Sequence, residues 1–324
     1  MNPIPYTVDN LGTFQQEWGT HQQCSEWWYA TGVLFDDAKN LYSYQYTVLS
    51  MFRGPYSPKI AMLALTDYKN NRHYYLQCPA APEVPVTISE NEISIAGMAS
   101  AVKHEDHMTI QLKHKDFTLD VKAGYGKGAF WHCNNGKLYM GTEEEDETTL
   151  YYSYTNMPTE AQLVLNGETI HLTGKTWFDK QGGIYGRKRN LNDHWEWFSL
   201  RFFDDEEVML FTFPRTGYVD GTYITAEGTS ARMNQYEIRQ TATVEDRGLI
   251  WSAGWEVKMP VKEQEYTIEP IQHGHINFAY FEELCYIKNR AGQIVGYAFA
   301  ELLPAVHNRP DQINIDNLFA RVEV

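Results

Sequence analysis

The residues best placed to do chemistry lie around Asp179. Trp177 and Phe178 directly precede this carboxyl in the sequence. An apolar setting disfavours the charged form of a carboxyl, so Asp179 would stay protonated near neutral pH and could donate its proton to a C=C bond. Turn chemistry offers an alternative, in which Asp179 begins a turn before Gly182 and Gly183. We predict that Asp179 is a general acid, which requires it to be buried.

Protonation of an isolated alkene creates a carbocation, which needs an apolar wall that tolerates positive charge. The chain contains 15 Phe, 9 Trp and 22 Tyr, more rings than packing alone requires. The face of an aromatic ring stabilises a nearby cation by about 0.5 to 2 kcal/mol. Packing in a core is the alternative role for any one ring. The rings that we expect to line the site are Trp177, Tyr152, Trp27, Trp28, Trp195 and Trp197.

Side chains that alternate along a strand cannot all face the same site. Trp195 and Trp197 are two residues apart, so they would lie on one face of a strand and Glu196 on the other. Trp27 and Trp28 are adjacent and would face opposite ways. Only some of these rings can therefore meet one ligand.

Two further groups carry weaker signals. Glu26 and Glu301 could act as an acid or orient a ligand, although an exposed strand position is the default for a glutamate. His273 and His275 would share one face of a strand, but no clear third ligand lies near them in the sequence. We therefore predict no metal site.

Composition and charge exclude several classes of protein. The formal net charge is −15 at pH 7, which would repel the phosphates of nucleic acids. No apolar run approaches the roughly 20 residues of a membrane span, and the N-terminal residues do not form an export signal. The 4 cysteines are far apart and form no metal or redox motif. We expect a soluble cytoplasmic protein with no nucleic-acid partner and no stable membrane insertion.

The elements that would position these residues are β-strands. Segments rich in Tyr, Trp, Val, Ile and Thr alternate with turn residues, and helical periodicity is hard to find. The sequence therefore predicts an all-β protein. The expected strands are 25–35, 41–52, 60–67, 73–77, 86–89, 108–114, 117–122, 150–155, 161–165, 169–173, 194–203, 208–213, 236–243, 249–259, 266–270, 276–287 and 294–303.

The length favours two domains. A chain of 324 residues exceeds the usual size of one core, and domains commonly have about 150 residues. The glycine-rich and then basic segment 182–190 is the best boundary, which gives domains 1–186 and 187–324. Glu26-Trp27-Trp28 and Glu196-Trp197-Phe198 each open an expected strand. This similarity indicates either an internal duplication or a chance match between aromatic strands.

Several motifs, taken in order along the chain, resemble the lipocalin-like family of carotenoid 1,2-hydratase (hydroxyneurosporene synthase) and AttH-related proteins. The resemblance spans most of the chain. It implies two lipocalin-like antiparallel β-barrel or sandwich domains in tandem. The matching segments are His21 with 26–32, Gln45 with 52–53, 64–67, 151–153, 177–181, 195–198, 280–282 and 296–302.

The resemblance also implies functional residues. In the hydratases of this family the matching aspartate is the implied acid, so Asp179, Trp177 and Tyr152 are expected to be catalytic. Two departures leave the substrate open: Gly182-Gly183 follows Gln181 where the family often has Trp-Gly, and Met62-Leu63 stands where a His is common. The residues expected to contact the substrate are Glu26, Trp27, Trp28, Gln45, Trp195, Trp197 and Glu301.

Three functions are compatible with these residues. The leading one is an enzyme without a cofactor that binds an apolar isoprenoid or polyene and catalyses acid-initiated hydration, cyclisation or isomerisation of a C=C bond. The relatives include carotenoid hydratases, isoflavonoid hydratases that resemble kievitone hydratase, and decalin-forming, Diels-Alderase-like proteins. A pericyclase that only folds a linear polyene is therefore the second possibility. A carrier that binds a hydrophobic molecule without changing it is the third.

Overall fold

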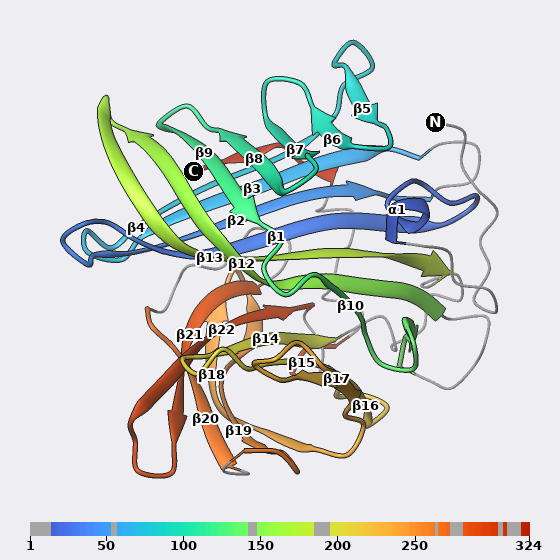
Figure 1. Cartoon of the computed structure of the whole chain (residues 1–324), viewed down its shortest axis with the longest axis vertical. Coiled ribbons are helices and arrows are strands. Elements are labelled where there is room, and N and C mark those ends of the chain that lie inside the picture. The colour runs from blue at the N-terminus through green and yellow to red at the C-terminus, as the bar shows by residue number, and fades with distance from the viewer. Residues whose placement is uncertain are drawn as a thin grey trace. The chain divides into compact units, whose positions relative to one another are not determined.

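The computed structural model describes residues 14–52, 57–141, 148–184, 195–262, 265–272, 281–303, 307–309 and 319–324. Within these ranges the regular structure is one short helix, α1 (Phe14–Glu17), and antiparallel β-strands (Figure 1). The prediction of an all-β fold is confirmed, with two curled sheets in tandem as expected for lipocalin-like domains.

The chain divides into two compact units. Unit 1 consists of Met1–Trp131, Thr149–Ile184 and Leu318–Val324, and unit 2 of His132–Thr148 and Tyr185–Asn317. A single cut of the chain would therefore misplace two segments. Residues 132–148 belong to unit 2 although part of unit 1 follows them, and residues 318–324 belong to unit 1 although they follow unit 2. The division into domains 1–186 and 187–324 remains a prediction about which parts fold independently.

Unit 1 is built on one long sheet. Its order is β23-β4-β3-β2-β1-β13-β12-β9-β8-β7-β6-β5, and β10 also pairs with β12. The strands are β1 (Ser25–Phe35), β2 (Leu41–Ser50), β3 (Lys59–Asp67), β4 (Arg72–Pro79), β5 (Val86–Ile88), β6 (Glu92–Ile95), β7 (Ala99–Lys103), β8 (His107–Lys113), β9 (Phe117–Gly124), β10 (Ala129–Trp131), β12 (Thr148–Leu165), β13 (Glu168–Ile184) and β23 (Val322–Glu323).

Unit 2 contains a second sheet, in the order β17-β16-β15-β14-β22-β21-β20-β19-β18. β14 therefore lies between β15 and β22 in this sheet, and β1 of unit 1 lies between β2 and β13. The strands of this sheet are β14 (Glu196–Phe202), β15 (Glu207–Phe213), β16 (Tyr218–Ile224), β17 (Ser230–Arg232), β18 (Glu237–Asp246), β19 (Leu249–Lys258), β20 (Glu265–Pro270), β21 (Phe281–Asn289) and β22 (Ile294–Leu302). The short strand β11 (Lys137–Tyr139) is not part of this sheet.

Local turn chemistry sets the first hairpin. The Asp36 carboxylate accepts hydrogen bonds from the backbone N–H of Asn40 at 2.8 Å and from its side-chain amide at 2.7 Å. Lys39 adopts a φ of 65° between them, and such a residue closes a tight turn between strands. β1 and β2 then pair from Phe35↔Leu41 to Glu26↔Ser50, so the prediction of this hairpin is confirmed.

Alternation along the strands builds one apolar core in each unit. In β1, Trp28, Ala30 and Leu34 belong to the core of unit 1, where they pack with Phe178 of β13. In β14, Phe198, Leu200 and Phe202 belong to the core of unit 2. Burial of a large apolar side chain stabilises a fold by about 1.5 to 3 kcal/mol, so these cores fix the register of both sheets.

Strand β23 closes one edge of the unit 1 sheet. Val322 pairs with Gln77 and Glu323 with Leu76 of β4. The Gln77 amide also donates a hydrogen bond to the carbonyl of Ala320 at 2.9 Å. Strand β23 is therefore part of the first sheet although it follows all of unit 2 in the sequence.

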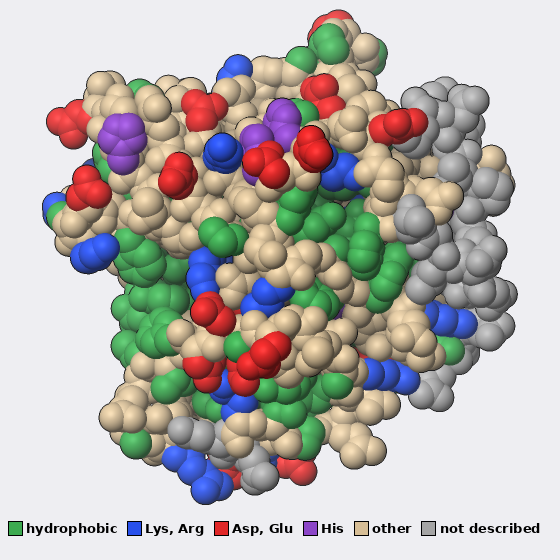
Figure 2. Space-filling model, in the orientation of Figure 1, with side chains coloured by type: hydrophobic (Ala, Val, Ile, Leu, Met, Phe, Trp, Pro, Cys, Tyr) green, Lys and Arg blue, Asp and Glu red, His purple; other side chains and the backbone are tan. Residues whose placement is uncertain are grey.

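The face shown in Figure 2 has no dominant patch of one charge. In Figure 2, Lys and Arg side chains are interspersed with Asp and Glu across the face shown. Within the described ranges, no helix is long and apolar enough to cross a membrane. All four cysteines are buried and form no disulfide.

Candidate active site

Asp179 lies in the middle of β13 and its side chain is only 3% exposed. The alternative of a turn before Gly182 and Gly183 is wrong, because β13 continues through both glycines to Ile184. Its neighbour across the ladder is Tyr29 of β1. The sheet thus holds the carboxyl away from solvent beside an aromatic ring.

Two hydrogen-bond donors contact one oxygen of Asp179. The indole Nε1 of Trp177 donates to Asp179 Oδ1 at 2.5 Å. The hydroxyl of Ser153 on β12 donates to the same Oδ1. Trp177 and Ser153 are both 0% exposed. We call this arrangement, made of Asp179, Trp177 and Ser153, the Asp179 clamp.

The side chains that share a face with the clamp are buried, and many of them are polar. Tyr29 stands between Asp179 and Thr47 in the pairing of β13, β1 and β2. Gln45 lies two positions from Thr47 and donates a hydrogen bond to its hydroxyl at 2.9 Å. Around the clamp both faces of the sheet are thus buried, and the face that carries Asp179 combines rings with hydroxyl and amide groups.

Trp27 and Gln181 are the next residues on the same face, each two residues along its strand from Tyr29 and Asp179. They are partners across the β1–β13 ladder, and Gln181 donates to the hydroxyl of Thr149 at 2.8 Å. Among the residues predicted from the sequence, Trp27, Gln45, Trp177 and Asp179 therefore share one face of the unit 1 sheet.

Tyr152 does not join the clamp. It is adjacent to Ser153 in β12, so its side chain points to the other face of the strand. Its hydroxyl donates to the carbonyl of Phe14 in α1 at 3.2 Å, and its ring lies 5.4 Å from that of Trp131. Burial raises the pKa of the Tyr152 phenol well above its ordinary value, which favours the neutral hydroxyl. The structure places Tyr152 against the N-terminal helix.

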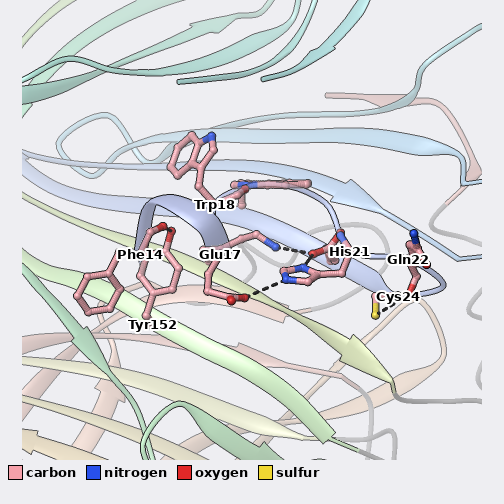
Figure 3. A network of polar contacts seen from close by, with 10 residues as sticks. Phe14, Glu17, Trp18, His21, Gln22, Cys24 and Tyr152 are labelled. Atoms are coloured by element: carbon pink, nitrogen blue, oxygen red, sulfur yellow. Dashed lines mark hydrogen bonds and ion pairs between the residues drawn. The ribbon is translucent and has the colours of Figure 1, made fainter. Parts of the chain in front are cut away.

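Glu26 also lies on the other face, in a buried network of charged groups. Figure 3 labels two members of this network, Glu17 and His21. Its carboxylate accepts a hydrogen bond from Lys180 Nζ at 2.7 Å and contacts His21 Nδ1 at 2.7 Å. His21 Nε2 lies 2.9 Å from Glu17 of α1. We call Glu17, His21, Glu26 and Lys180 the Glu26 network.

The charges of this network stabilise one another. Burial alone would raise the pKa of Glu26, but the charges and hydrogen bonds of Lys180 and His21 lower it below the ordinary value. Burial alone would lower the pKa of His21, but the hydrogen bonds that its imidazole donates to Glu17 and Glu26 raise it. Since the ionised form of Glu26 is favoured, this residue is a poor proton donor.

Trp28 belongs to the same side of the sheet as Glu26. Its ring centroid lies 4.6 Å from Lys180 Nζ, and its indole N–H donates to the carbonyl of Trp18 at 2.9 Å. The Trp18 ring stacks on Phe178 at 5.3 Å. Trp28 therefore packs in the core and holds α1 and the following residues in place, on the face opposite Asp179.

In unit 2 the predicted residues form a separate group. Trp195 donates its indole N–H to Glu301 Oε1 at 2.9 Å, and Glu301 pairs with Trp197 across the β14–β22 ladder. Burial raises the pKa of Glu301 to about 7, against the opposing effect of the Trp195 hydrogen bond. Glu301 is thus a carboxyl that is partly protonated near neutral pH.

Glu196 faces the opposite way from Trp197, as the alternation predicts. Its carboxylate accepts hydrogen bonds from Ser252 at 2.6 Å and from Trp255 at 3.0 Å within the core of unit 2. Burial raises the pKa of Glu196, and the hydrogen bonds from Ser252 and other donors oppose the shift. The prediction that Glu196 and Trp197 lie on different faces is confirmed.

Sequence reasoning assigned no role in these sites to Ser153, Lys180 or Glu17. Ser153 and Lys180 lie in the segments 151–153 and 177–181 that carry the family resemblance, but only the pairing of distant strands brings Ser153 to Asp179. Lys180 forms an ion pair with Glu26. Among the described residues no group of three or more His, Cys, Asp or Glu side chains is arranged to hold a metal ion. His273 and His275 lie outside the described residues.

Comparisons with known proteins relate the chain to one family. The AttH-like family model matches residues 7–304. The structure of a candidate AttH protein from Nitrosomonas europaea is similar over 94% of this chain and 100% of its own, with 20% identity and a TM-score of 0.82. Kievitone hydratase from Nectria haematococca is similar over 88% of this chain and 90% of its own, with 14% identity and a TM-score of 0.69. These structures share the fold. No curated protein sequence matches the chain.

Proposed function

Because the chain belongs to the AttH-like family, we propose that it is an enzyme that protonates a C=C bond of an apolar isoprenoid or polyene from Asp179. The reaction that follows is hydration, cyclisation or isomerisation, and it requires no cofactor. The observation that carries the proposal is the buried carboxyl of Asp179, with two donors on one of its oxygens.

The setting of Asp179 supports proton transfer. A buried carboxyl is held away from water, so its proton can be given to a substrate without competition from solvent. Tyr29 and Trp27 contribute rings to the same face, and ring faces stabilise a cation by about 0.5 to 2 kcal/mol each. Trp195, Trp197 and Glu301 would contact an apolar ligand in unit 2.

Hydration is the first reaction to test. A neighbour in the structural comparison is named as the hydratase of kievitone, and its likeness to this chain lies in the fold. In a hydration, Asp179 gives its proton to one alkene carbon, and the oxygen of water bonds to the resulting cation. The proton that this water then loses returns to the Asp179 carboxylate, so that the acid is restored.

The test replaces the acid and keeps the shape of the side chain. We expect Asp179→Asn to lose at least about 100-fold in turnover, the usual contribution of a general acid. The assay incubates the protein with lycopene or squalene in oxygen-18 water and measures labelled product by mass spectrometry. Asp120→Asn is the matched control, because Asp120 is an exposed carboxyl on β9 of the same unit.

The outcomes separate the three functions. Loss of labelled product in Asp179→Asn but not in Asp120→Asn supports the acid mechanism. A cyclised product formed equally well by Asp179→Asn would instead indicate a pericyclase. A ligand that is bound and released without chemical change would indicate a carrier.

A further inference from the structure

The two donors of the Asp179 clamp converge on the same atom. Trp177 Nε1 and Ser153 Oγ both donate to Oδ1 of Asp179. An oxygen that accepts two hydrogen bonds is a poor place for a proton, because an O–H there would point at other donors. The proton of a neutral Asp179 is therefore carried on Oδ2.

We propose that Ser153 and Trp177 are positioning residues, which hold Oδ1 of Asp179 and thereby place the acidic proton on Oδ2. This inference rests on the proposed function of Asp179 as the acid. It assigns to Ser153 a role in the reaction, and to Trp177 a role different from that of an aromatic wall.

The clamp also acts while the proton leaves. When Asp179 protonates the alkene, the Oδ2–H bond breaks, a C–H bond forms with the π electrons, and negative charge develops on the carboxylate. Hydrogen bonds to a charged acceptor are about twice as strong as those between neutral groups. The two donors therefore stabilise the transition state more than the ground state, which accelerates the step.

This role differs from that of a cation wall. The N–H of an indole lies at the edge of the ring, and in Trp177 it is directed at Asp179. A phenylalanine at position 177 would keep an aromatic face and lose this donor. Trp177→Phe thus distinguishes the two roles, because only the positioning role requires the N–H.

The first experiment measures the protonation of Asp179 directly, with no substrate. Infrared difference spectra between the full-length protein and Asp179→Asn report the carbonyl band of the protonated acid as the pH is raised from about 4 to about 9. Ser153→Ala and Trp177→Phe each remove one donor to the carboxylate, so the band should persist to higher pH in both variants. Ser153→Thr keeps a hydroxyl and should restore the original midpoint.

The control is Ser43→Ala. Ser43 is a buried serine of β2 in the same unit, and its hydroxyl contacts Tyr68 at 3.0 Å. This variant should leave the Asp179 band unchanged. Circular dichroism of each variant checks that the fold is intact, and Ser153→Thr provides a second folded comparison if Ser153→Ala is unstable.

The results distinguish two kinds of failure. A band that titrates in the unaltered protein and has the same midpoint in Ser153→Ala and Trp177→Phe would overturn the positioning role and leave Asp179 as the acid. Absence of the band over the whole pH range would instead show that Asp179 is always ionised, which rejects both proposals.

A kinetic measurement with whichever of lycopene and squalene is converted would show the same effect in two linked changes. Removing a donor makes Asp179 a weaker acid, so turnover at low pH should fall. The same variant should remain active to higher pH, because the acid keeps its proton longer. A defect that is only structural would lower turnover without moving the high-pH limit.

Discussion

Glu301 and Glu26 both have buried carboxyl groups, but these groups have different hydrogen-bond partners. Glu26 has the cationic partners Lys180 and His21, which lower its pKa. Glu301 accepts a hydrogen bond from the neutral indole of Trp195, and burial raises its pKa from 4.5 to about 7. Between about pH 4.5 and pH 7, Glu301 is therefore protonated in the folded protein and ionised in the unfolded chain.

This difference predicts how Glu301 affects stability. A raised pKa gives a contribution that is fully present below the unfolded value of 4.5 and is lost as the pH rises through about 7. Glu301→Gln cannot ionise. The free energy of unfolding of this variant, minus that of the unaltered protein, should therefore be larger at high pH than at low pH. Urea denaturation at about pH 5 and about pH 8 measures the change in the free energy of unfolding.

The matched control for this prediction is Glu227→Gln, since Glu227 is an exposed glutamate in a turn of unit 2. It should change the free energy of unfolding equally at both pH values. A difference between Glu301→Gln and the unaltered protein that does not grow with pH would contradict the raised pKa.

At the scale of single residues, the sequence indicated Asp179 but not its environment. Its aromatic neighbours in the chain suggested burial, and it is buried. The donor from Ser153 depends on the pairing of β12 with β13, which local sequence does not encode. Tyr152 was predicted beside Asp179, yet alternation along β12 puts Ser153 there and turns Tyr152 toward Phe14. To predict which side chains meet at a site, one must know which face of the sheet each of them lies on as well as where it stands in the sequence.

Among the elements, β13 depends on a glycine at the point where it passes Glu26. Gly182 pairs with Glu26 across the β1–β13 ladder. A Cβ atom at position 182 would lie 2.4 Å from Cγ and 2.9 Å from Cβ of Glu26. Glu26 cannot move aside easily, because Lys180 and His21 both bind its carboxylate.

We therefore expect Gly182→Ala to destabilise the protein by about 1 to 3 kcal/mol, the usual cost of an overpacked interior. Thermal or urea denaturation measures the loss. Gly124→Ala is the control, because a Cβ there meets only the carbonyl of Pro158 at 3.8 Å. Equal stability of the two variants would show that the Glu26 network can rearrange around a methyl group.

The strands themselves were predictable where turns are marked by local residues. The hairpin of β1 and β2 has Asp36 and Asn40 at its turn, and its first strand was predicted with the bounds that it has. The segments 150–155, 161–165 and 169–173 were expected as three short strands, but they are parts of the long strands β12 and β13. Their extension through Pro158 and Gly182 depends on pairing with neighbouring strands, which overrides local propensity.

At the scale of the whole molecule, the two units repeat one arrangement. In each unit the first strand of the sheet carries a buried glutamate on the core side, Glu26 in β1 and Glu196 in β14. β1 pairs with β2 and β13, and β14 pairs with β15 and β22, so each of the two strands lies between the next strand along the chain and a strand from much later in its unit. Glu26-Trp27-Trp28 and Glu196-Trp197-Phe198 thus occupy equivalent positions in the two sheets. An origin of the two units by duplication remains a prediction.

The cysteines offer a test of how the two units unfold. Cys24 and Cys78 lie in unit 1, and Cys133 and Cys285 lie in unit 2. All four are buried, and burial raises the pKa of the Cys133 and Cys285 thiols well above the ordinary value. Since the thiolate is the reactive form, we expect a maleimide to label none of them in the native protein.

Labelling in increasing urea, followed by mass spectrometry of peptides, should then give two pairs. Cys24 and Cys78 should become reactive together, and Cys133 and Cys285 together, because each unit exposes both of its thiols when it unfolds. Different midpoints for Cys24 and Cys78 would contradict cooperative unfolding of unit 1.

The pairing of β23 with β4 has a consequence for protein synthesis. A ribosome releases residues in chain order at about 5 to 20 per second, so β4 emerges well before Val322 and Glu323. Until these residues arrive, the backbone groups along this edge of β4 lack the partners that β23 provides, and such an open edge invites pairing with other chains. Translation thus finishes the first unit only after the second has been made, and the nascent protein must protect an unfinished edge in the meantime.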